Sequence, residues 1–220
     1  MTGQPVVGDM QDVLEMVSPD GLTVRAAHRR NSYSYAMSGE KLDALLVDLG
    51  LRRAASVWRN HTVDADRAPR GVYPRACMGF VIMDPTVPAW LTDTDAVLGV
   101  ITVGDEGSSF LANAAAKAAG HRRLGRNYGE AVLVDPHLCG DGNFRYGHSA
   151  EVRGLIVGAS SQSTDQDLYE AASLAGDLVT AIAETHRSWL EQAGPAVDWF
   201  AAADAPAEAY REMVDWFGAA

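Results

Sequence analysis

The chain has 220 residues, and its hydrophobic fraction of 47% is that of a protein with a packed core. Its formal net charge of −11 at pH 7 argues against a nucleic-acid-binding protein and against binding to acidic membrane surfaces, because both need a concentrated positive face. No apolar run approaches the roughly 20 residues that span a bilayer, and no secretory signal pattern opens the sequence. We therefore expect a cytoplasmic protein.

The first half of the chain carries strand-like and helix-like patterns. After a polar lead with a short amphipathic piece, apolar and polar residues alternate over 21–27, as in a strand. Apolar residues at helical spacing follow over 38–50, where Ser38 can cap a helix and Gly50 can end it. The pattern then predicts strands over 54–63, 76–84 and 96–104.

The second half predicts two helices with strands between them. Residues 105–125 indicate a helix that ends near Gly125, and a short strand follows over 130–135. Residues 143–160 indicate two strands around a Gly-His-Ser-Ala turn. The best-supported element runs from about residue 164 to about residue 192, because its apolar residues form a nearly continuous helical stripe behind a cap at Thr164.

These elements indicate the fold class. The strands and helices do not alternate strictly, and the hairpin within 143–160 points to antiparallel pairing. We therefore predict an α+β fold, a largely antiparallel β-sheet with helices packed on it. Residues 1–195 are expected to form a single domain, in which residues 1–96 are an N-terminal elaboration. Residues 196–220 are expected to form a C-terminal amphipathic extension.

The segment from about residue 97 to about residue 190 carries a family-like pattern. A hairpin with a central glycine runs into the strand Gly-Leu-Ile-Val-Gly over 154–158, which is similar to a G-x-I-x-V-x-G strand, and then into a helix that begins with Gln-Asp, and an A-x-x-K-A helix lies upstream. The residues concerned are Gly147, Gly154, Ile156, Gly158, Gln166, Asp167, Ala175 and Gly176, with Ala114, Lys117 and Ala118 upstream. This pattern resembles the GlcG/HbpS group, the DUF336-type haem-binding or haem-degrading-like proteins. Residues 101–111 are similar to the group's V-x-D-x-G-G-x-L hairpin, but Ser108 replaces its second glycine, and the group's Arg-Met-Asp-Gly-Ala segment has no counterpart.

The resemblance implies a core over residues 97–193, in a compact domain that assembles into homo-oligomers. It also implies a small-molecule site between or within the subunits. Haem or another tetrapyrrole is the best-known ligand of the group, so haem is the cofactor that the resemblance makes possible. Membership of such a group does not name a reaction, because one fold hosts many functions.

Reactive side chains are densest over residues 135–148. His137 and Cys139 could ligate zinc or haem iron, with His148 returning from the predicted hairpin and Tyr146 as a further cofactor contact. The segment lacks four ligands at a recognised zinc spacing, so a polar loop without a bound metal is the alternative. Acid–base chemistry in a small-molecule pocket is a third interpretation.

A second cluster lies at the end of the helix predicted over 105–125. Lys117 and His121 share one helix face, and Arg122 and Arg123 follow, so the four could hold a carboxylate, a phosphate or a haem propionate. The alternative is structural, because cations near a helix C-terminus are favoured by the macrodipole. Lys117 could also be a desolvated amine for Schiff-base chemistry, and Glu130 a general base.

Three functions remain open from the sequence. The first is an oligomeric protein that binds a small molecule, such as haem or another planar anion, near the basic cluster around Lys117. The second is a cofactor-independent, lyase- or cyclase-type enzyme of specialised metabolism that performs a cyclisation or decarboxylation by proton transfer. Its candidate acid–base residues are His137, His148, Lys117 and Glu130. The third is a regulatory or structural oligomer.

Overall fold

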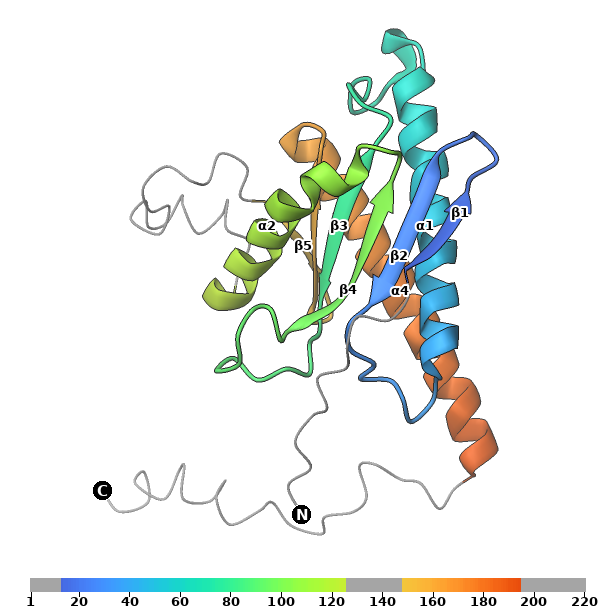
Figure 1. Ribbon diagram of the computed structural model, residues 1–220, viewed down its shortest axis with the longest axis vertical. Coiled ribbons are helices and arrows are strands. Elements are labelled where there is room, and N and C mark those ends of the chain that lie inside the picture. The colour runs from blue at the N-terminus through green and yellow to red at the C-terminus, as the bar shows by residue number, and fades with distance from the viewer. Residues whose placement is uncertain (1–12, 126–147, 195–220) are drawn as a thin grey trace, which may run out of the picture. The chain divides into compact units, whose positions relative to one another are not determined.

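The computed structural model describes residues 13–125 and 148–194 (Figure 1). Its strands are β1 (Leu14–Val17), β2 (Thr23–His28), β3 (Met78–Met83), β4 (Val97–Val103), β5 (Ala150–Val152) and β6 (Leu155–Ser160). Its α-helices are α1 (Gly39–Thr62), α2 (Leu111–Leu124) and α4 (Thr164–Ala193), and its 3₁₀ turns are η1 (Ala65–Arg67) and η2 (Gly107–Phe110). The chain divides into two compact units, residues 1–183 and 184–220, and the sheet belongs to the first. None of these helices is both long and apolar enough to cross a membrane.

The described strands form one six-stranded sheet in the order β1-β2-β4-β3-β6-β5. Every neighbouring pair of strands is antiparallel. Three of these pairs are local, β1 with β2, β3 with β4 and β5 with β6, whereas β2 with β4 and β3 with β6 join distant parts of the sequence. The structure therefore confirms the predicted α+β class with helices packed on an antiparallel sheet.

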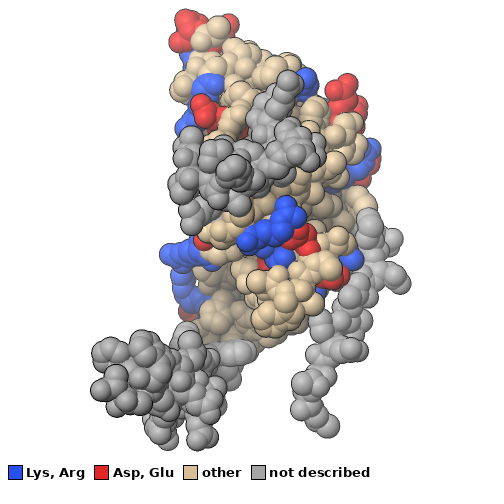
Figure 2. Space-filling model, turned by 90° about the vertical axis from the view of Figure 1, so that its left-hand side faces the viewer, with Lys and Arg blue, Asp and Glu red and all other residues tan. Residues whose placement is uncertain are grey.

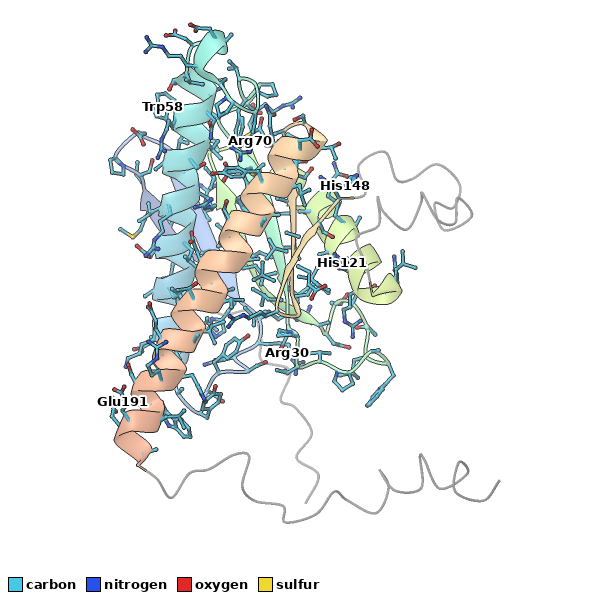
Figure 3. The ribbon with its side chains drawn as sticks, turned by 180° about the vertical axis from the view of Figure 1, so that it is seen from behind. Arg30, Trp58, Arg70, His121, His148 and Glu191 are labelled. Carbon is cyan, nitrogen blue, oxygen red and sulfur yellow. The ribbon has the colours of Figure 1, made fainter. Side chains whose placement is uncertain are left out.

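Helices cover the two faces of the sheet. Alternate residues of a strand point to opposite faces, and β3 shows this clearly. Phe80 packs in a cluster with Leu46 of α1 and Leu174 of α4, whereas Val81 packs in a second cluster with Ala114 of α2. Figure 1 accordingly shows α2 in front of the sheet, and Figure 3, from behind, shows α1 and α4 in front of it.

Helix α1 is twice as long as the sequence predicts, so the predicted helix end at Gly50 and the predicted strand over 54–63 are wrong. Ser38 does cap the helix, since its side chain accepts a hydrogen bond from the Lys41 N–H. Gly50 is needed for packing instead: a Cβ there would lie 2.5 Å from Val24 Cγ1. The apolar spacing continues beyond it, and Ala54 and Val57 are fully buried.

Two other local predictions need correction. The polar lead contains a strand, β1, which pairs with β2. The hairpin of β5 and β6 turns at Arg153 and Gly154, which have φ values of 51° and 84°, whereas Ala150 of the predicted turn is the first residue of β5. Two consecutive positive φ values are typical of the two-residue hairpin turn. The strand predicted over 130–135 lies outside the described residues.

Helix α4 begins at Thr164 as predicted, but Ser163 is the residue that precedes its first turn. The Asp167 N–H donates to the Ser163 carbonyl oxygen, and the Gln166 side-chain oxygen accepts the Ser163 N–H at 3.1 Å. The hydrogen bond from the Ser163 N–H to the Gln166 side chain is one of the two bonds that make up a capping box. It leaves the Asp167 carboxylate available for contacts outside the helix.

Candidate functional site

Helix α2 carries four of the five described candidate residues, Lys117, His121, Arg122 and Arg123, and lies very close to β6. Gly158 makes this approach possible, because a Cβ at that position would overlap the carbonyl oxygen of Ala114. Lys117 and His121, one turn apart, are only 2% and 4% exposed, because both point toward the sheet side of the helix. The shared face that the sequence predicts for this pair is therefore a buried face.

Lys117 is the donor of a buried ion pair. Its Nζ donates to Asp167 Oδ2 at 2.7 Å and to the Ala159 carbonyl oxygen at 2.8 Å, and both charged side chains are 3% exposed. The other carboxylate oxygen, Asp167 Oδ1, accepts the backbone N–H groups of Ser161 and Gln162 at 3.1 and 2.9 Å. The pair ties α2 to the start of α4.

Burial raises the pKa of the Asp167 carboxyl, while the Lys117 ammonium and the backbone donors oppose that rise. The Lys117 amine is 3% exposed and is already bound by the Asp167 carboxylate and the Ala159 carbonyl oxygen, so no substrate carbonyl can approach it in this arrangement. The geometry therefore favours a structural role for Lys117 over Schiff-base chemistry.

His121 lies between a hydroxyl and a carboxylate. Its Nδ1 is 2.8 Å from Ser149 Oγ, and its Nε2 is 3.5 Å from Glu151 Oε2. Ser149 directly precedes β5 and Glu151 lies on it, so their side chains point to the same face of the strand, toward α2. The Ser149 residue is 1% exposed, whereas 45% of the Glu151 side chain reaches solvent.

A second candidate histidine, His148, directly precedes Ser149 along the chain. It is partly exposed. Figure 3 labels His121 and His148 on the same side of the molecule, where α2 and β5 lie. The structure thus brings His121, from the basic cluster on α2, and His148, the last residue of the segment 135–148, to the same side of the molecule.

Arg122 and Arg123 are engaged by an acidic loop. Arg122 donates to the carbonyl oxygens of Pro88 and Leu91 and to Asp93 Oδ1, and Arg123 donates to Asp93 Oδ2 at 3.1 Å. On the face shown in Figure 2, Lys and Arg side chains lie beside Asp and Glu side chains and form no extended basic surface. The two arginines bind the loop between β3 and β4 to α2, which is a structural role.

The remaining candidates, Glu130, His137, Cys139 and Tyr146, lie outside the described residues. Among residues 13–125 and 148–194 there is no group of three or more side chains that could hold a metal ion. Four of the described candidates are engaged within the protein, because Lys117, Arg122 and Arg123 bind carboxylates and the His121 ring lies between Ser149 and Glu151.

Two other buried polar groups were not foreseen from the sequence. His28 Nδ1 lies 2.6 Å from Asp43 Oδ1, which joins β2 to α1. Glu170 of α4, fully buried, accepts hydrogen bonds from Ser56, Tyr73 and Arg53. Burial and the Glu170 carboxylate raise the pKa of the Tyr73 phenol. Both groups connect elements of the core. The first pairs an imidazole with a carboxylate, and the second places two hydroxyls and a guanidinium on a carboxylate.

Sequence reasoning did not identify Ser149 and Glu151 as site residues. A signal was present, since two polar residues spaced by one position in a strand share a face. Their proximity to His121 depends on how α2 packs on β6 and β3, beside β5, which a single sequence does not specify.

Comparison with known proteins adds no relative. No protein-family model matches the chain, and no significant match to it was found among curated proteins or solved structures. The resemblance to the GlcG/HbpS group therefore stays a prediction.

Proposed function

We propose that this protein binds a small molecule at the edge formed by α2 and β5, and that His121 transfers a proton there. The observation that supports this most strongly is the placement of the His121 ring, with Ser149 Oγ 2.8 Å from one nitrogen and Glu151 Oε2 3.5 Å from the other. Imidazole exchanges protons near neutral pH. A hydroxyl on one ring nitrogen and a carboxylate on the other is the arrangement that activates a hydroxyl for reaction.

Each residue has a distinct role in this proposal. His121 takes the proton of the Ser149 hydroxyl, and the Glu151 carboxylate stabilises the imidazolium that forms. Low exposure of His121 and Ser149 strengthens these interactions, because the local dielectric is low. The partly exposed Glu151 and His148 mark the side from which a small molecule would reach the hydroxyl.

The proposal corresponds to the proton-transfer enzyme among the three functions that the sequence left open. It moves the acid–base role from Lys117, which is held by Asp167, to His121. Roles for His137 and Glu130 stay predictions. We also propose that the protein forms a homo-oligomer, as the family resemblance implies. The roles of the described site residues do not depend on that assembly.

A covalent probe tests the proposal without knowledge of the substrate. A small sulfonyl fluoride reacts when a serine oxygen attacks sulfur, fluoride leaves, and a base takes the hydroxyl proton. We expect the probe to modify Ser149, as mapped by peptide mass spectrometry, and His121→Gln to slow the modification by at least about 100-fold. His61→Gln is the matched control, because His61 Nδ1 contacts a backbone carbonyl oxygen, that of Tyr73, rather than a hydroxyl. The proposal fails if Ser149 stays unmodified, or if His121→Gln reacts like the wild type.

Ligand screening tests the binding half of the proposal. We expect at least one compound of a small-molecule panel that includes haemin to raise the melting temperature of the wild-type chain, because a ligand of the native state stabilises it. The increase should disappear in Glu151→Ala, which removes the solvent-exposed side chain of the site, and persist in His61→Gln. Stabilisation that is equal in Glu151→Ala would place the ligand elsewhere.

A further inference from the structure

Strand β1 forms an open edge of the sheet. In the described part of the chain it pairs only with β2 (Figure 1). All of its residues are exposed, and Met16 and Val17 present 50% and 63% of their surfaces to solvent. Monomeric proteins commonly protect such an edge with lysine, proline or a bulge. The one charged residue of β1, Glu15, is instead bound to Arg25 of β2 at 2.6 Å.

The register of the hairpin shows which backbone groups face the open edge. The Ser18 N–H donates to the Leu22 carbonyl oxygen at 2.8 Å, next to the pair formed by Val17 and Thr23. Hydrogen-bonded and non-hydrogen-bonded pairs alternate along an antiparallel ladder. Met16 therefore bonds to β2, whereas the N–H and C=O groups of Glu15 and Val17 point away from β2.

We propose that β1 pairs antiparallel with β1 of a second copy of this chain, around a two-fold axis at Met16. In this register Glu15 of each copy faces Val17 of the partner subunit. Each of these residues then exchanges both of its outward backbone hydrogen bonds. Met16 faces Met16 of the partner subunit in a non-hydrogen-bonded pair, and the two sheets become one.

Charge and symmetry favour a second copy as the occupant of the edge. The strand is self-complementary, as a two-fold interface requires, because each outward-facing residue finds its complement in the other copy. A register centred on Glu15 would bring two carboxylates together, and the register centred on Met16 avoids this. The Glu15–Arg25 pair stays intact within each subunit. Only four residues of each copy pair in this arrangement, so we expect a weak dimer with a dissociation constant on the order of 10 μM.

Sedimentation of the full chain tests the assembly. The observed mass should rise from 23.5 kDa toward twice that value between about 1 and about 200 μM. Val17→Pro should keep the chain monomeric, because it removes an outward N–H while leaving the bonds between β1 and β2 in place. The control is Trp90→Lys, which changes a side chain 85% exposed in the β3–β4 loop and should dimerise like the wild type. A wild-type monomer at the highest concentration, or a Val17→Pro dimer, overturns the proposal.

Disulfide trapping tests the register. Paired Cα atoms of a non-hydrogen-bonded pair are about 4.5 Å apart, within the range that a disulfide bridges. Met16→Cys should therefore form at least ten times more linked dimer than Val17→Cys, which faces the partner's Glu15. Equal trapping of the two variants contradicts the register. Failure of the dimer would leave probe labelling of Ser149 unchanged, so it is distinguishable from failure of the proposed function.

Discussion

The buried pair of Lys117 and Asp167 allows a quantitative prediction. Removal of one partner leaves the other charge buried without its counter-ion, which costs about 3–5 kcal/mol. Lys117→Met leaves the Asp167 carboxylate with only the backbone donors of Ser161 and Gln162, and Asp167→Asn leaves the ammonium with only the Ala159 carbonyl oxygen. For a chain of this size, such a loss lowers the melting temperature by about 6–20 °C.

The double variant separates the pair interaction from general damage to the core. Lys117→Met combined with Asp167→Asn removes both charges, while the asparagine oxygen can still accept the backbone N–H groups. We expect the double variant to be less destabilised than the sum of the single variants, by at least about 2 kcal/mol. Urea denaturation followed by far-ultraviolet circular dichroism measures each free energy of unfolding.

Small, additive effects of the two substitutions would refute the structural role of the pair. If each single variant costs less than about 1 kcal/mol and the two costs add, the pair behaves like an exposed surface ion pair. Lys117 would then be available for chemistry, and the structural role assigned to it would be wrong.

Three further predictions concern other parts of the fold. Gly158→Ala should destabilise the protein by about 1–3 kcal/mol in urea denaturation, because its Cβ would lie 3.0 Å from the Ala118 nitrogen and push α2 away. The control Gly176→Ala should stabilise it by about 0.5–1 kcal/mol, since nothing lies within 4 Å of that Cβ in α4. Tyr73→Phe should cost about 1.5–3 kcal/mol, because Glu170 loses a buried hydrogen bond. Burial and Asp84 raise the pKa of Tyr33 from 10.0 to about 12. Its contribution to stability should therefore be present below pH 10 and disappear as the pH rises through about 12, as absorbance at 295 nm and urea denaturation of Tyr33→Phe would show. If the part of the absorbance change that Tyr33→Phe removes has its midpoint near pH 10, the effect assigned to burial and Asp84 is absent.

Local patterns predicted much of the fold. The cap at Ser38, the end of α2 at Gly125 and the stripe of α4 depend on neighbouring residues, and each was predicted correctly. Gly50 was misread because glycine ends helices often, whereas here it allows α1 to approach Val24 of a distant strand. β1 was missed because four exposed residues show no alternation between buried and exposed positions.

The candidate site was less predictable than the fold. Placement of Lys117 and His121 on one helix face follows from helical periodicity. Their partners do not, because Asp167 is 50 residues from Lys117 and Ser149 is 28 residues from His121. Those contacts result from packing of α2 on β6 and β3, and the close approach at Gly158 makes it possible.

The pH dependence of Ser149 labelling by a sulfonyl fluoride tests the central claim most directly, because it measures whether His121 takes the hydroxyl proton. If it does, the labelling rate should rise and level off across the range of about pH 5–8 in which imidazoles titrate. Glu151→Gln should shift that rise to lower pH, since the carboxylate stabilises the imidazolium. A rate that only increases in proportion to hydroxide, equally in the wild type and in His121→Gln, would contradict the account.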